Sequence, residues 1–228
     1  MASDLLSGGI VADGTVIVTN NQTAGKGQRG NKWESEPGQN LTLSAMVKPY
    51  FLPIAKQFDL TVITSLAIVH TLENFELTSA RVKWPNDIYY HDDKIAGILI
   101  ENTVRATQLE WAVLGIGLNV NQQQFKVGNA TSISLVSGKE LELQQVLNKL
   151  LVHLNRNYQK LKSGLQEELR DEYTQKLMWI NQRRTFREKD NEESFNGMIV
   201  RVTESGKLVI QTKQTERSYD FKEIVFVG

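Results

Sequence analysis

Short stretches of apolar and β-branched residues predict strands along the first half of the chain. Residues 15–19 and 41–47 have this character, and they flank a segment rich in glycine and basic residues. Further stretches follow with only short turns between them, at residues 81–84, 88–90, 94–101 and 109–120. Because such short connections join antiparallel neighbours, we expect one largely antiparallel sheet.

Three other segments carry apolar residues at helical spacing. The first helix is expected from Pro53, which suits a first helical turn, to about Phe75. Its apolar residues fall on one face, and they are Phe58, Val62, Leu66, Val69 and Leu72. Two further helices are expected over 143–161 and 165–177, separated at Gly164. We expect these helices to cover one side of the sheet.

After Trp179 the pattern changes to short alternating strands joined by tight turns. The expected strands are residues 198–202, 207–212, 219–221 and 224–227. A chain of 228 residues can form one moderate domain and a small one. We therefore expect a first domain over residues 1–180 and a small β-barrel over residues 181–228.

Composition narrows the classes of function. The chain has 26 basic and 26 acidic residues, which argues against general affinity for nucleic acid. It contains no cysteine, so disulfides, thiolate metal sites and a cysteine nucleophile are excluded. Its three histidines lack metal-ligand spacing, and no apolar run approaches the roughly 18 residues of a membrane span. We expect a cytoplasmic protein with no membrane partner and no protein-held metal.

The run Val82-Lys83-Trp84-Pro85-Asn86-Asp87-Ile88 carries the most specific chemistry. Pro85 lacks a backbone donor and ends the strand, so Asn86 and Asp87 fall at a bend where polar side chains can face a cleft. Lys94 opens the returning strand, and Gly97 leaves room for close approach to the backbone. A lysine, an amide and a carboxylate in this layout predict a site that handles anions.

Two further segments suit phosphate and carboxylate ligands. Residues 22–33 form a loop with glycines at 25, 27 and 30 and with the cations Lys26, Arg29 and Lys32. Such glycines permit close backbone approach, while the cations offset anionic charge. Residues 115–121 form a glycine–asparagine strand, in which Gly115 and Gly117 again allow close approach.

In order and spacing, over residues 14–121, these three segments resemble the motifs of biotin protein ligases. The resemblance implies an α+β fold: a mixed, largely antiparallel sheet with helices on one face, similar to class II aminoacyl-tRNA synthetase catalytic domains, followed by an SH3-like barrel. It also implies that biotin and ATP form biotinyl-5'-AMP, whose acyl group passes to a lysine of a biotin carboxyl carrier protein. The resemblance is also compatible with a homodimer.

The resemblance also implies roles for individual residues. Lys94, Asp87 and Arg29 would be catalytic, with Lys94 bridging the acyl oxygen and the α-phosphate. Mg²⁺ would enter with ATP, held mainly by phosphate oxygens and water. The residues implied to face biotin are Gln22, Gly25, Lys26, Gly27, Gln28, Lys94, Gly97, Gly115 and Ile116. Those implied to face ATP are Arg29, Asn31, Trp33, Asn86, Lys94 and Asn119.

The chain departs from the family pattern in two places. Gln28 stands where most members have an arginine, and it cannot supply a guanidinium for phosphate. The family's first strand and Ser-Thr-Asn segment would fall before Met1, and we expect this part of the biotin wall to be missing. The helix-turn-helix domain of the repressor–ligases is absent from this sequence, so DNA binding is not implied.

Two alternatives remain open at this point. A lipoate–protein ligase would share the fold and the adenylation chemistry, although its Arg-Arg-x-Ser-Gly-Gly-Gly type of loop is not found in the sequence. A protein that binds biotin or a carrier without turnover would also fit the two departures.

Overall fold

The computed structural model describes residues 5–6, 11–25, 27–30, 32–126, 128–189 and 191–227. Six of its strands form one sheet in the order β1-β2-β6-β5-β4-β3, and each neighbouring pair is antiparallel. These strands are β1 (Thr15–Thr19), β2 (Asn40–Val47), β3 (Ala80–Lys83), β4 (Asp87–Tyr90), β5 (Asp93–Arg105) and β6 (Gln108–Asn119). The expected antiparallel sheet is thus confirmed.

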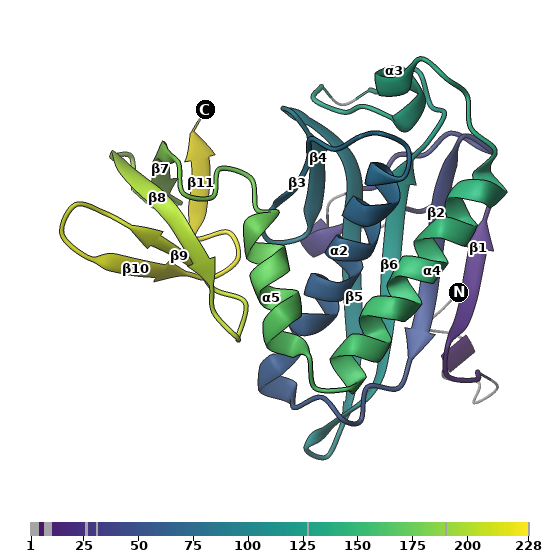
Figure 1. The fold of residues 1–228 in the computed structure, drawn as a ribbon, viewed down its shortest axis with the longest axis horizontal. Helices are drawn as coiled ribbons and strands as arrows, with labels where there is room; N and C mark the ends of the chain where they lie inside the picture. Colours follow the sequence, from purple (N-terminus) through teal and green to yellow (C-terminus); the bar gives the residue numbers. More distant parts are fainter. Residues whose placement is uncertain are drawn as a thin grey trace.

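The helices lie together on one face of this sheet (Figure 1). They are α2 (Asp59–Glu73), α4 (Leu143–Lys162) and α5 (Gln166–Gln175), while the short α3 (Ile133–Ser137) lies near the upper end of the sheet. Two 3₁₀ turns, η1 (Gln28–Gly30) and η2 (Ile54–Lys56), complete the helical elements. The prediction of a helix starting at Pro53 was wrong, because Pro53 precedes η2 and α2 starts only at Asp59.

The helix α2 is buried on nearly all sides rather than on the single face that its apolar spacing predicts. Leu60, Ile63 and Ile68 have no exposed surface, although they lie outside the predicted stripe. The reason is that α2 packs against strands β3 to β6 on one side and against α4 and α5 on the other. A helix enclosed in this way has to be apolar all round.

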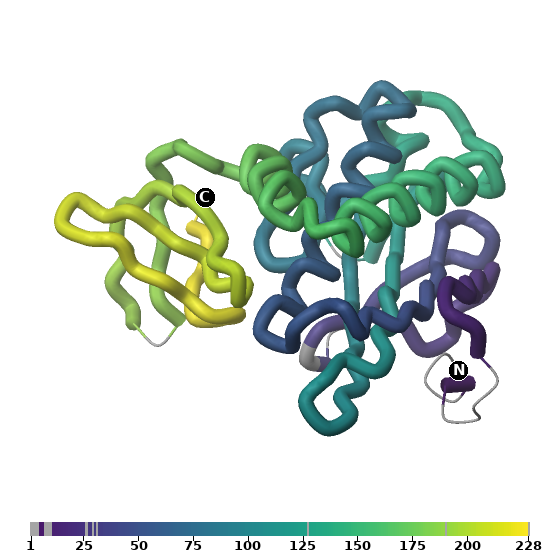
Figure 2. The backbone as a smooth tube through the Cα atoms, turned by 60° about the horizontal axis from the view of Figure 1, so that its bottom comes forward, coloured from purple at the N-terminus to yellow at the C-terminus, as the bar shows by residue number. Residues whose placement is uncertain are grey.

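The remaining strands form a second sheet, which Figure 2 shows as a separate lobe beside the helices. Its order is β10-β9-β8-β7-β11. Its strands are β7 (Arg183–Glu188), β8 (Ser194–Val202), β9 (Leu208–Gln211), β10 (Glu216–Tyr219) and β11 (Ile224–Val227). Within the described residues β10 and β11 are not paired with each other, so the expected barrel is not closed by hydrogen bonds.

The two sheets are held against each other by a turn of the second one. The Trp84 indole donates a hydrogen bond to the Gly206 carbonyl over 2.9 Å, and Arg170 of α5 pairs with Glu204 over 2.9 Å. Phe58 packs so closely on Gly206 that a Cβ at this glycine would lie 2.6 Å from its ring. Trp84 belongs to the segment from Val82 to Ile88 that the sequence analysis singled out. The second sheet is therefore anchored directly beside the predicted site.

Candidate functional site

One row of residues crosses all six strands of the first sheet. The cross-strand partners in this row are Thr19, Thr42, Gly117, Gly97, Asp87 and Lys83. Adjacent residues along the strands, such as Ile88, Ala96 and Leu118, are fully buried in the core on the helical side. The row therefore faces away from the helices, and its two central glycines form a trough with polar side chains at both ends.

A cavity of about 630 Å³ lies over this trough, a size typical of small-molecule sites. The predicted site residues that line it are Gln22, Gly27, Gln28, Trp33, Asn86, Asp87, Lys94, Gly97, Gly115 and Ile116. Segments far apart in the sequence thus meet in one place.

Asp87 and Lys94 form an ion pair in this cavity, with 2.7 Å between Oδ1 and Nζ. Regular alternation along β5 would turn Lys94 to the buried side, because Gly97 faces the cavity. The register between β4 and β5 shifts at Ile88/Tyr89, and Ile95 and Ala96 are both fully buried. This irregularity brings Lys94 onto the cavity side, which is a common use of β-bulges near active sites.

Asn86 sits at the turn between β3 and β4 and is tied to β5. Its Nδ2 donates to the Ile98 carbonyl over 2.6 Å, and its own carbonyl accepts from the Ile98 amide over 3.0 Å. These two bonds fix the turn next to Asp87. The amide oxygen of Asn86 takes no part in either bond and remains able to accept from a ligand.

Trp33 lies on the glycine floor of the cavity. A Cβ on Gly117 would come within 2.7 Å of the indole Nε1 and closer still to the ring carbons, and one on Gly97 would lie 3.2 Å from Cζ3. Both Trp33 Nε1 and Gln22 Oε1 are buried and have no hydrogen-bond partner among the described residues. A buried donor and a buried acceptor are costly when unpaired, so this end of the cavity suits a ligand with both kinds of group.

Five predicted site residues do not line the cavity or cannot be placed. Gly25 packs against the backbone of Trp33, and Asn119 is buried with its Nδ2 donating to the Thr131 carbonyl. Lys26 and Asn31 lie outside the described residues, as does the side chain of Arg29.

The sequence analysis missed several residues that line the cavity. Thr19, Thr42 and Ser44 bring hydroxyl groups from β1 and β2, and a polar residue facing away from a core is the only sequence signal for them. Phe221 and Lys222 belong to the second sheet and reach the cavity from its β10–β11 turn. No local pattern could have assigned these two residues, because they depend on how the two sheets pack.

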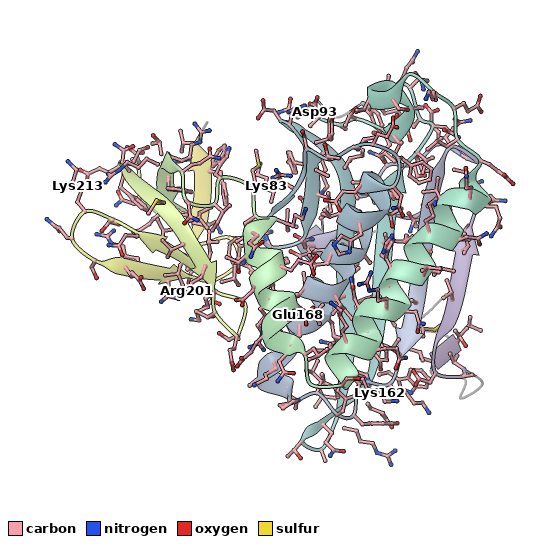
Figure 3. All side chains as sticks on the ribbon, viewed as in Figure 1. Lys83, Asp93, Lys162, Glu168, Arg201 and Lys213 are labelled. Carbon is pink, nitrogen blue, oxygen red and sulfur yellow. The ribbon has the colours of Figure 1, made fainter. Side chains whose placement is uncertain are left out.

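Lys83, at the end of the row, stands between the two sheets (Figure 3). Its ammonium lies 4.5 Å from the ring centre of Tyr89 and 3.4 Å from that residue's hydroxyl. Burial lowers the pKa of Lys83, and the neighbouring charge of Asp87 opposes this shift. Lys83 thus places a second cation beside Asp87.

A second cavity, of about 530 Å³, lies among α2, α4 and α5. Its polar groups are engaged with one another: His70 with Glu172 over 2.7 Å, His153 with Asn74 over 2.9 Å, and Lys160 with Glu168. This cavity lacks the glycine floor of the first one, and its one orphaned group among the described residues is His153 Nδ1. The described residues include no cluster of His, Cys, Asp or Glu that could hold a metal ion, and no helix among them is long and apolar enough to cross a membrane.

Comparisons with known proteins agree with this geometry. A model of the biotin/lipoate A/B protein ligase family matches residues 3–119. The bifunctional ligase/repressor BirA of Bacillus spizizenii is 28% identical over 216 residues, which cover 89% of this chain and 63% of that protein. The biotin--[acetyl-CoA-carboxylase] ligase of Mycobacterium tuberculosis is 30% identical over 159 residues, which cover 67% of this chain and 58% of that protein.

Among solved structures, the biotin protein ligase from Aquifex aeolicus in complex with biotin and ATP is similar throughout. The TM-score is 0.78 at 27% identity, and the match covers 94% of this chain and 89% of that one. The chain spans less than two thirds of the BirA relative, at 63% of its length. The family model nevertheless covers just over half of the chain, and the fold agrees. The chain therefore belongs to the biotin/lipoate A/B protein ligase family.

Proposed function

We propose that this protein is an ATP-dependent biotin–protein ligase. The observation that carries the proposal is the Asp87–Lys94 pair at one end of a glycine-floored cavity that also contains two buried polar atoms, Gln22 Oε1 and Trp33 Nε1, without a partner among the described residues. The names of the relatives support biotin, since the similar proteins from Mycobacterium tuberculosis and Aquifex aeolicus are a biotin--[acetyl-CoA-carboxylase] ligase and a biotin protein ligase.

The cavity fits the head of biotin chemically. The ureido ring has N–H donors and a carbonyl acceptor, which complement the Gln22 acceptor and the Trp33 donor. Its thioether ring and aliphatic tail are apolar, and they suit the indole face of Trp33 and the bare backbone at Gly115.

In the first step, a biotin carboxylate oxygen bonds to the α-phosphorus of ATP while the bond to pyrophosphate breaks. Both reactants are anionic, so a cation between them stabilises the transition state more than the separated substrates. We assign this role to Lys94, and its ammonium lies 2.7 Å from the Asp87 carboxylate, which supports the assignment. Gly27, Gln28 and Lys32 of the loop would enclose the adenylate.

In the second step, the amine of a carrier lysine attacks the acyl carbon, and AMP leaves with the bonding electrons. Asp87 lies in the same cavity as an ionised partner of Lys94 and can orient the incoming amine or accept its proton. The acceptor we propose is a biotin carboxyl carrier protein. Arg29, Asn31 and Asn119 keep the ATP-binding roles expected from the family resemblance, and Lys26 keeps the biotin-binding role.

Mg²⁺ accompanies ATP in such reactions by neutralising phosphate charge. The described residues offer no cluster of metal ligands, whereas Asn86 and Asp87 both line the cavity and would help to orient a hydrated ion. We assign catalysis to residues 1–180, and we propose that residues 181–228 act as a cap on the site. Nucleic acid is not a partner in this proposal, because the charge is balanced. A homodimer can be tested by sedimentation.

The direct test is to incubate the protein with ATP and Mg²⁺ together with either biotin or lipoate, and to identify the acyl-adenylate by mass spectrometry. The proposal expects biotinyl-5'-AMP and no lipoyl-AMP. Lipoyl-AMP alone would assign the protein to the lipoate branch of the family. Tight binding of biotin without any adenylate would indicate a binding protein without turnover.

A further inference from the structure

The second sheet contributes to the cavity through one turn, between β10 and β11. Phe221 and Lys222 of this turn line the cavity together with Asp87 and Lys94. The position of the turn is fixed by Phe221, whose ring centre lies 5.3 Å from that of Trp84 and 6.2 Å from that of Phe58. Lys222 is the next residue, so its backbone is held at the edge of the catalytic cavity.

The backbone at Lys222 is one that rarely carries a side chain. Its φ is +70°, in the left-handed region that glycine adopts most easily. Glycine would satisfy this backbone at least as well as lysine does, so the turn itself does not require a lysine. Six other described non-glycine residues also have a positive φ, so Lys222 is distinguished by its place at the cavity.

The charges around the cavity indicate a role for the Lys222 side chain. Lys94 is already paired with Asp87, while Lys32 and Lys222 form no ion pair with another described residue. Gln28, also in the cavity, is neutral. A triphosphate brings about four negative charges to this cavity, and among its described lining residues Lys32 and Lys222 are the lysines without an ion-pair partner.

Lys222 also borders another, shallow cavity whose lining carries three carboxylates, Glu188, Asp220 and Glu223, and one further lysine, Lys189. An anion is less favoured beside these acidic groups than in the catalytic cavity, which contains the glycine trough and Lys94.

We propose that Lys222 is a nucleotide-binding residue that contacts the β- and γ-phosphates of ATP, the part that leaves as pyrophosphate. This inference rests on the proposed function. The second sheet then takes part in catalysis by supplying a positive charge. The glycine loop lacks this charge at residue 28, because Gln28 is neutral.

The test uses Lys222→Gly, which removes the ammonium and leaves a residue suited to φ +70°. The matched control is Lys213→Ala, which removes one exposed positive charge from the outer tip of the same sheet (Figure 3). Binding of α,β-methylene-ATP and of AMP is measured by calorimetry for each full-length protein. The KM values for ATP and biotin are then measured by pyrophosphate exchange.

We expect Lys222→Gly to weaken α,β-methylene-ATP binding and to raise the KM for ATP about tenfold or more, the effect of one charge-assisted contact. Binding of AMP and the KM for biotin should stay within about twofold, and Lys222→Arg should restore nucleotide affinity. Lys213→Ala should behave as the wild type does.

Equal affinity of wild type and Lys222→Gly for α,β-methylene-ATP would overturn the inference, even in a protein that makes biotinyl-5'-AMP. A rise only in the KM for the carrier would overturn it as well. Tight nucleotide binding that depends on Lys222, in a protein that activates no biotin, would support the inference and refute the proposed function. The two claims therefore fail separately.

Discussion

At the scale of single residues, the cavity depends on positions where no side chain is present. Gly97 and Gly117 are direct cross-strand partners, and the Trp33 indole rests on both of them. The ring leaves no room for a methyl group at Gly117, because a Cβ there would overlap it. The shape of the cavity floor thus depends on the absence of a Cβ atom at Gly97 and at Gly117.

Gly117→Ala should therefore push Trp33 off the floor and weaken biotin binding by about tenfold or more, since small displacements of positioning groups cost this much or more. Gly128→Ala is the control, because a Cβ at Gly128 meets nothing within 4 Å. Titration calorimetry with biotin measures the effect. Unchanged affinity in Gly117→Ala would show that Trp33 does not shape the pocket.

At the scale of elements, the sequence predicts what local pattern controls. The strands at 15–19 and 41–47 are confirmed as β1 and β2, and the helices near 143–161 and 165–177 as α4 and α5. The strand β7 was missed because Arg183–Glu188 is rich in charge and only Phe186 is fully buried. The face of the sheet on which the Lys94 side chain lies could not be predicted from local pattern either, because it depends on a register shift between β4 and β5.

The contact between α2 and α4 should make stability depend on pH. His153 of α4 bonds to Asn74 through Nε2, while its Nδ1 is buried without a partner. Burial lowers its pKa from the ordinary 6.5, and the neighbouring His70, Arg156 and Lys149 lower it further. The unfolded chain therefore binds the proton more readily, so stability falls as the pH drops below about 6.5.

Replacing His153 with glutamine keeps a donor for Asn74 and removes the titration. We expect the loss of melting temperature between about pH 7.5 and about pH 5.5 to be smaller in His153→Gln than in the wild type. His91→Asn, at an exposed turn position, is the control and should leave the loss unchanged. An equal loss in all three proteins would remove His153 as the cause.

At the scale of the whole molecule, an ionic junction joins helices α2 and α5 to the second sheet. Arg170 donates two hydrogen bonds to the buried carboxylate of Asp59, over 2.6 and 2.8 Å, and also pairs with the exposed Glu204 of the second sheet. Burial raises the pKa of Asp59, and Arg170 opposes this shift. Such long-range contacts, like those of Phe221 and Lys222, were not predictable from sequence, because they join elements distant along the chain.

The two partners of Arg170 should matter unequally. Arg170→Met removes the hydrogen-bonded counter-charge of the buried Asp59 and should reduce the free energy of unfolding by about 3 kcal/mol or more. Glu204→Gln removes only an exposed partner and should change stability little. Denaturant titration of both variants provides the comparison. Similar losses in the two variants would contradict the role given to Asp59.

The central claim is that Lys94 stabilises charge transfer between biotin and ATP in this cavity. Biotin-dependent exchange of labelled pyrophosphate into ATP measures that step directly. We expect exchange in the wild type and a loss of at least about a hundredfold in Lys94→Ala. The melting temperature should stay unchanged, because the ammonium stabilises the transition state and is not part of the core. Exchange at the wild-type rate in Lys94→Ala would contradict the account.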